Sequence, residues 1–232
     1  MARRNTFIIP LTVTPFSPLS LTNLRLWVKS DTGVTLNGEG VSQWADQSGL
    51  GHHLIQDSEG AQPTYVSNQL NGYGTIQFDG VDDKLATTGF TLTQPETVFI
   101  IFKTPTFVSG GYVFDGLTGD SGAFFPYSSS PTVFMYAGAS FYPITGIVGS
   151  YYMATCIYNG TSSIFQANNV AEQSGNAGAS NMGGFTVGAY AGGAGYPGNP
   201  HIAEIIIMAA TATDTERANM KAYVTARYGI TM

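Results

Sequence analysis

Three aspartates lie close together in the segment Thr75-Ile-Gln-Phe-Asp-Gly-Val-Asp-Asp-Lys-Leu85, where a strand-like run gives way to a turn. Asp79, Asp82 and Asp83 could gather their carboxylate oxygens around calcium, a hard cation that takes several oxygen ligands at once. Alternatively, Asp79 and Gly80 form the turn that ends the strand, and the later aspartates cap or solvate the next strand. Both interpretations remain open at this point, and calcium is the one cofactor that these residues suggest.

Familiar patterns of catalytic residues are missing from the sequence, so we predict no catalytic residues and a protein that is not an enzyme. Glycan hydrolysis uses a pair of carboxylic acids, and the glutamates show no local pairing such as Glu-x-Asp-x-x-Glu, although carboxyl groups from distant segments could still meet. Cys156 lies in a strand-like run, which predicts a buried, inert thiol. His52 and His53 are adjacent, so on a strand they would point to opposite faces and could not share a metal ion.

Aromatic side chains offer a better prospect, because sugar sites combine aromatic faces with amide and carboxylate groups. Aromatic residues make up 12% of the chain. Strand alternation must place roughly half of them in the core. Tyr127, Tyr142 and Tyr196 are flanked by Pro, Gly or Ser, which is typical of exposed loops. We therefore predict that these three tyrosines bind glycans.

The composition favours one large all-β domain. The chain has 232 residues, with Gly 29, Pro 11 and only 10% charged residues, which fits many short strands joined by tight turns. A net charge of −6 argues against nucleic acid as a partner. A single cysteine excludes an intrachain disulfide, and no apolar run approaches the length of a membrane span. A charge-poor surface suits glycan contact or packing into a larger assembly.

The first residues differ from the rest of the chain. Residues 1–22 contain no acid and are interrupted by prolines, so we predict an extended N-terminal arm, followed by one domain over residues 23–232. A free, unstructured terminus is the alternative. The basic pair at the start precedes only a short apolar stretch, so no signal peptide is expected. The residues that we expect to dock on a partner are Arg3, Arg4, Phe7, Ile8 and Ile9.

Strand-like runs recur along the chain. Residues 24–29 alternate apolar and polar side chains, which predicts a half-buried strand with Leu24, Leu26 and Val28 on one face. Residues 97–103 form a continuous apolar run, which suits a strand in the core of a sandwich. The alternating and continuous patterns together predict a layered β-structure.

Local signals also mark a hairpin and a helix. Asn159-Gly160 separates two strand-like runs and predicts a β-hairpin. Thr213 and Glu216 fit a capping box at the start of a helix, and Gly229 fits its end. The apolar face of this predicted helix consists of Met220, Tyr223, Val224 and Tyr228.

Several of these segments resemble one family, the concanavalin A-like, laminin-G-like jelly-roll domains of bacteriophage virion proteins and bacterial surface proteins. The similar segments are Leu26-Trp-Val-Lys-Ser-Asp31, Val41-Ser-Gln-Trp-Ala-Asp-Gln-Ser-Gly-Leu-Gly-His-His53, Ile76-Gln-Phe-Asp-Gly-Val-Asp-Asp-Lys-Leu85, the strand at 202–208 and the helix at 214–230. The resemblance covers residues from about 24 to 230. It implies a two-sheet concanavalin A-like jelly-roll sandwich with one C-terminal α-helix, and it implies that Asp79 and Gly80 form a structural corner.

These observations lead to an expected function. We expect a non-enzymatic virion structural, decoration or adhesion protein on the phage particle surface, anchored to capsid or tail proteins by its arm and presenting a lectin-like domain to host glycans. The alternatives are a free bacterial carbohydrate-binding module, extracellular or at the cell surface, and a glycan hydrolase or lyase with an unfamiliar site. A homo-oligomer is compatible with each, although no coiled-coil heptad requires one.

Overall fold

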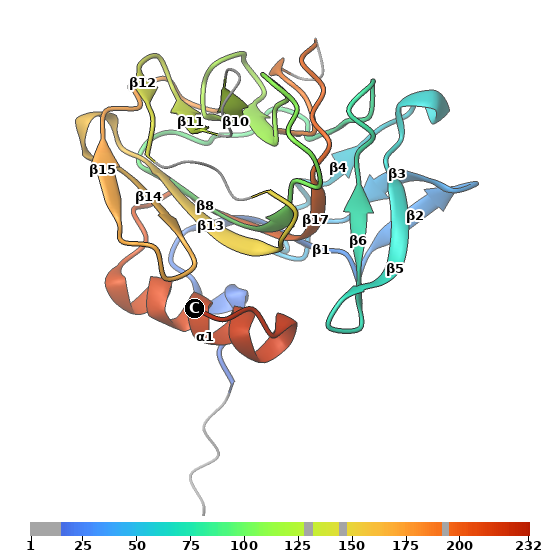
Figure 1. Cartoon of the computed structure of the whole chain (residues 1–232), viewed down its shortest axis with the longest axis horizontal. Coiled ribbons are helices and arrows are strands. Elements are labelled where there is room, and N and C mark those ends of the chain that lie inside the picture. The colour runs from blue at the N-terminus through green and yellow to red at the C-terminus, as the bar shows by residue number, and fades with distance from the viewer. Residues whose placement is uncertain (1–14, 128–131, 144–147, 192–194) are drawn as a thin grey trace, which may run out of the picture.

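The structure is a computed structural model that describes residues 15–127, 132–143, 148–191 and 195–232. Its described part is an all-β fold with one α-helix at the C-terminal end, which confirms this level of the prediction (Figure 1). Hydrogen-bonded pairing joins the described strands into a single sheet of seventeen strands. The finer prediction of a two-sheet jelly roll does not match this continuous pairing.

The strands before the middle of the chain are β1 (Leu24–Lys29), β2 (Val34–Asn37), β3 (Gly40–Trp44), β4 (Leu54–Ile55), β5 (Thr64–Leu70), β6 (Tyr73–Gln77), β7 (Leu85–Ala86), β8 (Glu96–Lys103) and β9 (Phe114–Gly116). Those that follow are β10 (Ala123–Tyr127), β11 (Thr132–Tyr136), β12 (Ser140–Phe141), β13 (Tyr152–Tyr158), β14 (Ser163–Ala167), β15 (Gln173–Gly175), β16 (Phe185–Val187) and β17 (His201–Met208). The helices are the short 3-10 turns η1 (Pro18–Ser20), η2 (Glu59–Ala61) and η3 (Gly160–Ser162), and helix α1 (Asp214–Tyr228).

The sheet folds back on itself around one core. One run of strands has the order β1-β17-β8-β13-β14-β15. A second run has the order β2-β3-β4-β7-β16-β9-β10-β11-β12. Strands β5 and β6 connect the two runs, because β5 pairs with β3 and β6 pairs with β17. Side chains from both runs meet in the largest hydrophobic cluster.

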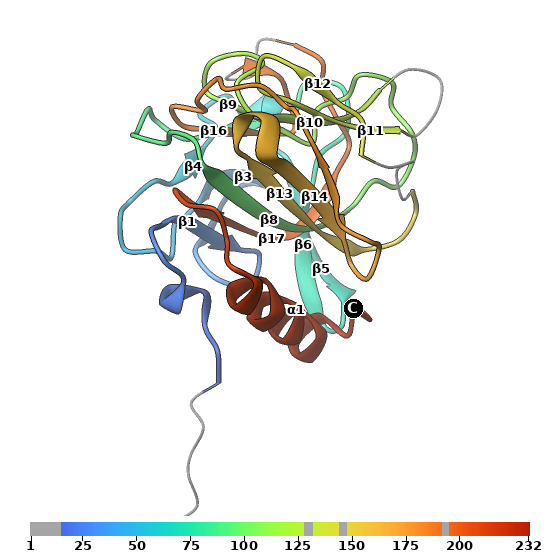
Figure 2. The same ribbon diagram turned by 90° about the vertical axis from the view of Figure 1, so that its left-hand side faces the viewer.

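Strand β8 is buried on both faces, as its continuous apolar run predicted. Val98, Ile100 and Phe102 enter the core between the two runs, whereas Phe99 and Ile101 face helix α1. The helix lies beneath β8, β13 and β17 in both views (Figures 1 and 2). Burying a side chain of this size contributes about 1.5 to 3 kcal/mol. The helix therefore closes the outer face of a strand that would otherwise be exposed.

Helix α1 begins and ends where the sequence predicted. The Thr213 Oγ1 atom accepts a hydrogen bond from the Glu216 backbone N–H at 3.2 Å, and the Glu216 carboxylate accepts one from the Thr213 N–H at 2.9 Å. Gly229 ends the helix in the left-handed conformation, with φ of 69°. The helix has 15 residues and is too short and too polar to cross a membrane.

The described part of the predicted arm packs against this helix. The Thr22 N–H donates to Glu216 Oε1 at 2.9 Å, and the Phe16 ring meets the Tyr223 ring edge-on, with centroids 6.2 Å apart. Residues 15–22 are thus part of the domain surface. The expected partner contacts of the arm, which are Arg3, Arg4, Phe7, Ile8 and Ile9, lie outside the described residues.

Two β-bulges change which side chains share a face. The pairing of β1 with β17 shifts register between Leu24 and Leu26, so Leu24 joins the helix side while Leu26 and Val28 enter the core. The prediction that these three residues share one face is therefore wrong for Leu24. A second shift, between β17 and β8, lies next to Glu204 and brings this residue to the helix side. A bulge adds one residue to a strand, and strict alternation cannot foresee it.

Candidate functional site

A pocket of about 420 Å³ with polar and apolar walls lies at the end of β6 and the start of β17. These strand ends lie away from helix α1 (Figure 1). We call it the acidic pocket. Its walls come from β5, from the turn that follows β6, from the loop after β8 and from the first residues of β17. The lining residues are Thr64, Val66, Gln77, Phe78, Asp79, Asp83, Pro105, Asn199 and His201. Pairing of His201 with Gln77 brings segments more than a hundred residues apart to one place.

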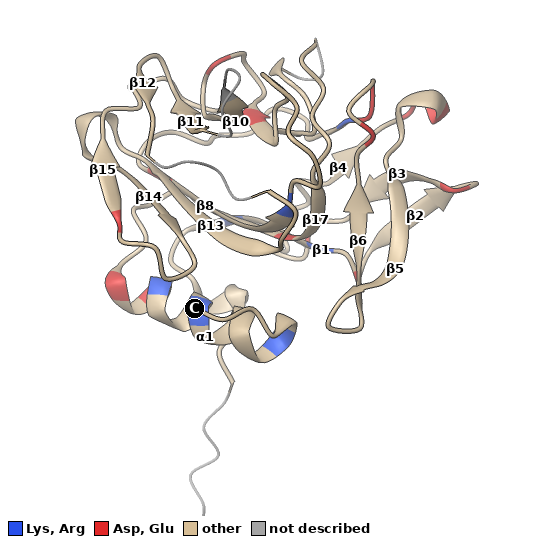
Figure 3. Cartoon of the chain, viewed as in Figure 1, with Lys and Arg blue, Asp and Glu red and all other residues tan. Residues whose placement is uncertain are grey.

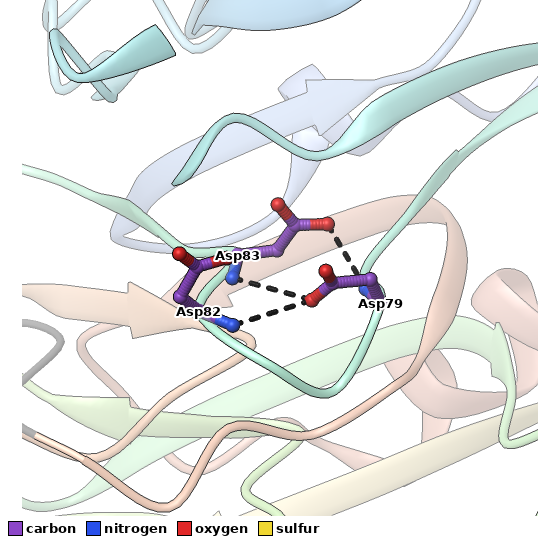
Figure 4. Close-up of side chains that lie close together, drawn as sticks. All are labelled: Asp79, Asp82 and Asp83. Carbon is purple, nitrogen blue, oxygen red and sulfur yellow. Dashed lines mark hydrogen bonds between the residues drawn. The ribbon is translucent and has the colours of Figure 1, made fainter. Parts of the chain in front are cut away.

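The three predicted aspartates do meet in this turn, and their contacts are those of a self-capped turn (Figure 4). The Asp79 Oδ1 atom accepts hydrogen bonds from the N–H groups of Val81 at 2.7 Å, Asp82 at 3.3 Å and Asp83 at 3.5 Å. The Asp83 Oδ2 atom accepts one from the Asp79 N–H at 2.9 Å. One oxygen of each carboxylate lies within 4.8 Å of the others. The calcium site stays a prediction, because the turn interpretation already accounts for these hydrogen bonds.

The carboxylates of the acidic pocket differ in exposure. Asp79 is exposed, whereas Asp83 is buried. Burial raises the pKa of Asp83 to about 6, the Asp79 N–H opposes this, and the negative charge of Asp79 adds to the rise. Figure 3 shows acidic residues in the loop after β6 and basic residues along helix α1. The pocket therefore carries negative charge above about pH 6.

Two further residues of the acidic pocket each have a side-chain polar atom without a hydrogen-bond partner among the described residues. The Asn199 side-chain N–H donates to Thr106 Oγ1 at 2.7 Å, while its buried Oδ1 atom has no partner among the described residues. The buried Nδ1 atom of His201 likewise lacks a partner there. Burial lowers the pKa of His201 to about 4, and the nearby positive charge of Lys103 acts in the same direction. At neutral pH the imidazole is uncharged and can donate through one nitrogen and accept through the other.

Sequence reasoning missed Gln77, Asn199 and His201, because nothing in their local sequence marks them. His201 directly precedes the strand expected at 202–208, and Asn199 belongs to a Gly- and Pro-rich loop. They become neighbours of the aspartates only through the pairing of β17 with β6. A contact of this kind has no signature in a single sequence.

The predicted tyrosines lie elsewhere. Tyr196 is 64% exposed and Tyr142 is 49% exposed, and the side chain of Tyr127 lies outside the described residues. The Tyr196 ring meets Tyr190 and Tyr112, with centroids 5.9 and 6.0 Å apart. Neither Tyr142 nor Tyr196 lines the acidic pocket. Their role in glycan binding stays a prediction.

Adjacent histidines and the cysteine have structural contacts. The His53 Nδ1 atom accepts a hydrogen bond from the Asp46 N–H at 3.0 Å, and the His52 ring stacks on Phe90 at 3.9 Å. These two imidazoles have separate surroundings, as their adjacency predicted. Cys156 is fully buried in β13, which confirms the prediction of a buried thiol, and burial raises its pKa.

Three buried carboxyl groups were also missed by sequence reasoning. Glu204 accepts hydrogen bonds from Trp27 Nε1 at 2.6 Å and from the hydroxyls of Tyr228 at 2.6 Å and Tyr223 at 2.9 Å. Burial raises its pKa, and these hydrogen bonds act in the opposite direction. An acid inside the apolar run of β17 was the signal that could have revealed it. We call this group of side chains the Glu204 cluster.

The other two buried carboxyls are Glu96 and Asp115. Glu96 Oε1 accepts a hydrogen bond from the Met182 N–H at 3.3 Å, and its Oε2 atom has no partner among the described residues. Burial raises the pKa of Glu96 to about 8. Asp115 accepts hydrogen bonds from backbone N–H groups, including those of Gly116 and Ala191, and burial raises its pKa to about 6. Both side chains are fully buried, and neither lines the acidic pocket.

No protein-family model matches the chain, and no curated protein sequence matches it. Solved structures do. Domain 4 of a GH43 extracellular arabinanase from Geobacillus stearothermophilus, in complex with arabinotriose, has a TM-score of 0.63 at 11% identity over 86% of this chain and 98% of that domain. A GH54 α-L-arabinofuranosidase has a TM-score of 0.64 at 12% identity over 82% of this chain. Trypanosoma rangeli sialidase in complex with sialic acid has a TM-score of 0.58 at 11% identity over 86%.

At these identities the likeness shows a shared fold. The chain spans 51% of the arabinofuranosidase and 32% of the sialidase, but almost all of the arabinanase domain. The similar region is thus a part of larger proteins in two cases and a complete domain in the third.

These structures correct three predictions. They are glycosidases or a domain of one, so the assignment to concanavalin A-like, laminin-G-like domains of phage and bacterial surfaces is wrong. The expected virion structural role is wrong for the same reason. The expectation that the chain is not an enzyme is contradicted too, because these structures bear the names of glycoside hydrolases. The segments that suggested the first family are strands, turns and the C-terminal helix, which define local structure and not function.

Proposed function

We propose that this chain binds a neutral oligosaccharide in the acidic pocket. The observation that carries the proposal is the pocket itself, about 420 Å³ of space whose walls combine carboxylates, amides and an uncharged imidazole. Pockets of about 300 to 1,000 Å³ with a few converging polar groups are the usual sites for small ligands. The likeness in fold to an arabinanase domain in complex with arabinotriose supports this class of ligand.

The polar groups of the pocket suit sugar hydroxyls. A hydroxyl donates one hydrogen bond and accepts others, so a wall that binds sugars needs both donors and acceptors. Asp79 and Asp83 supply acceptors, and the Gln77 and Asn199 side chains supply amide groups. Thr64 adds an exposed hydroxyl at the rim. A ligand rich in hydroxyls matches this combination better than an apolar one.

The charge of the pocket favours a neutral sugar over an acidic one. Asp83, with a pKa of about 6, is ionised at neutral pH, and His201, with a pKa of about 4, is uncharged. An acidic sugar would bring a second negative charge next to Asp83, and like charges at close range are unfavourable. We therefore expect arabino-oligosaccharides to bind and sialylated oligosaccharides not to bind.

Isothermal titration calorimetry tests the proposal directly. Arabinotriose, xylobiose and a sialylated trisaccharide are titrated into the wild-type chain and into the variants Asn199→Ala and His201→Leu. These variants leave the hydrogen bonds of the aspartate turn in place. We expect each to weaken arabinotriose binding roughly tenfold, which corresponds to about 1.4 kcal/mol.

A matched control is Gln166→Ala, because Gln166 is a polar strand residue in β14 that does not line the pocket. Its affinity and its melting temperature should equal those of the wild type. The proposal is wrong if no neutral oligosaccharide binds the wild type, or if the pocket variants bind as well as the control does.

Glycan cleavage at the same pocket is a second candidate. Asp79 and Asp83 both line the pocket, and one oxygen of each lies within 4.8 Å of the other. Retaining glycosidases use two carboxyl groups about 5 Å apart, one as acid and one as nucleophile. The raised pKa of Asp83 suits the acid, which leaves Asp79 as the nucleophile.

Product analysis separates cleavage from binding. The wild type is incubated with arabino-oligosaccharides between pH 5 and pH 7, and released sugars are measured by chromatography. Under the cleavage hypothesis Asp83→Asn abolishes product while arabinotriose still binds, although more weakly. If the wild type binds but releases no product, the second candidate is rejected and the first stands.

A further inference from the structure

A second pocket of about 330 Å³ lies next to the acidic pocket. Its lining residues are Ala61, Val81, Asp82, Lys84, Ala189, Gly195 and Pro197. We call it the second pocket. The two pockets share two walls. The turn 79–84 gives Asp79 and Asp83 to the acidic pocket and Val81, Asp82 and Lys84 to the second.

The other shared wall is the segment that leads into β17. Gly195 and Pro197 line the second pocket, and Asn199 and His201 line the acidic pocket. Along this segment the chain passes from the second pocket to the acidic pocket, whereas residues of the turn 79–84 alternate between the two. The pockets therefore share two stretches of chain as walls.

The two walls lie close together at Gly80. A Cβ atom added at this glycine would lie 3.3 Å from the Cβ of Asn199, and Gly80 has φ of +78°, which other residues rarely adopt. The backbone at Gly80 and the side chain of Asn199 thus form a narrow partition between the pockets. Because glycine has no side chain, the partition stays thin.

Both pockets combine polar and apolar walls. In the second pocket Val81, Ala61, Ala189 and Pro197 are the apolar part, and Asp82 and Lys84 are the charged part. Val81 is 72% exposed at the tip of the turn. A sugar ring has an apolar face of C–H groups and a rim of hydroxyls. Apolar walls with Asp82 and Lys84 beside them fit such a ring as well as the acidic pocket fits its hydroxyls.

We infer that the two pockets form one groove, in which an oligosaccharide crosses the partition at Gly80 and places one sugar ring in each pocket. The inference rests on the proposed function and extends it, because it assigns a second sugar subsite and names Val81 as a residue that determines preferred chain length. The occupant is a neutral chain of at least two sugar units, and a single sugar fills only the acidic pocket.

The test compares chain lengths. Arabinose, arabinobiose and arabinotriose are titrated into the wild type, Val81→Asn and Ala61→Trp, the latter of which fills the second pocket. We expect the wild type to bind the trisaccharide at least tenfold more tightly than arabinose. Both variants should lose most of this gain and keep the affinity for arabinose. Val170→Asn is the matched control, since Val170 is also an exposed valine in a turn but lies outside both pockets.

The outcomes distinguish the two proposals. If all three ligands bind the wild type equally, or if Val81→Asn and Ala61→Trp leave the trisaccharide affinity unchanged, the second subsite is wrong while the acidic pocket stands. If no sugar binds the wild type, the proposed function fails and the second subsite fails with it. A loss of arabinose affinity in folded Val81→Asn, confirmed by an unchanged melting temperature, also overturns the subsite as described.

Discussion

The Glu204 cluster and the acidic pocket both contain carboxylates and both include a residue of β17, but their carboxylates have opposite surroundings. Glu204 is fully buried, and its carboxylate accepts hydrogen bonds from donors on β1 and on helix α1. Asp79 is exposed, and its hydrogen bonds come from backbone N–H groups of its own turn. The first carboxylate joins distant elements, and the second shapes a surface turn that remains accessible.

The difference shows what makes a carboxylate available to a ligand. A buried acid is costly unless donors satisfy it, and once satisfied it has no capacity for a further partner. An acid held by its own turn keeps its position without help from remote side chains. We therefore expect the effect of a substitution to be largest at the carboxylate with the most partners and smallest at one that is partly exposed at the surface.

Glu204→Ala should have the largest effect. It leaves the Trp27 indole N–H and the hydroxyls of Tyr223 and Tyr228 without their acceptor, so we expect a loss of about 3 to 5 kcal/mol of unfolding free energy. Urea denaturation followed by tryptophan fluorescence measures this. Glu204→Gln keeps one acceptor oxygen and should lose less. A loss under about 1 kcal/mol for Glu204→Ala would mean that the cluster is not a major link between sheet and helix.

Glu96→Gln should stabilise the protein at neutral pH. The pKa of Glu96 is raised from 4.5 to about 8, so between these values the folded state holds a proton that the unfolded state has lost. Stability from this group is therefore present below about pH 4.5 and falls as pH rises towards 8. Replacing Glu96 by Gln removes this titrating group, so the free energy of unfolding should rise by up to about 3 kcal/mol at pH 7 and by little at pH 4.

Denaturation curves of wild type and Glu96→Gln at pH 4, 5.5 and 7 measure this difference. The stability gap should widen as pH rises. A gap of the same size at all three values would show that folding does not raise the pKa of Glu96.

Binding in the acidic pocket should weaken at low pH. Burial raises the pKa of Asp83 to about 6, so Asp83 is an anionic acceptor above that pH and is protonated below it. We expect arabinotriose affinity to fall several-fold between pH 7 and pH 5. Calorimetry of the wild type and of Asp83→Asn provides the check, because the variant should bind weakly at both pH values. If the affinity changes with pH to the same extent in both proteins, another group controls the pH dependence of binding.

Glu216→Ala should have the smallest effect. This partly exposed acid completes the capping box of helix α1 and accepts a hydrogen bond from the Thr22 N–H. Losing it should cost about 1 kcal/mol, measured by thermal denaturation. Glu39→Ala, at an exposed glutamate in the β2–β3 turn, should change stability by less than about 0.5 kcal/mol. If Glu216→Ala lowered the free energy of unfolding as much as Glu204→Ala does, the proposed order of effects would be wrong.

The sequence predicted those parts of the fold that depend on neighbours in the chain. Asn159 and Gly160 do lie between two antiparallel strands, β13 and β14, as predicted, although the connection is the 3-10 turn η3 and not a two-residue Asn-Gly turn. The capping box at Thr213 and the end at Gly229 were correct, because their residue types favour helix ends locally. Leu24 was placed on the wrong face, because a bulge depends on how β1 and β17 align.

The candidate site could be predicted only in part. Asp79, Asp82 and Asp83 are close in sequence, so a short turn is enough to bring their carboxylates together. Asn199 and His201 join them through the pairing of β17 with β6, at a distance that no local pattern encodes. Tyr142 and Tyr196 lie outside the acidic pocket, because exposure in a loop does not define which surface a side chain lines.

By itself, the sequence determined the all-β class, the strands, the hairpin and the capped helix, since periodicity, turn residues and caps act over a few neighbouring residues. Only the tertiary structure decided the role of each acid. Glu204 lies inside β17, Glu96 begins β8 and Asp83 lies in a turn, and none of these positions shows which hydrogen-bond donors will reach the acid. Their roles depend on which donors reach them from other segments and on whether water and ligand can approach, and both are properties of the packed fold.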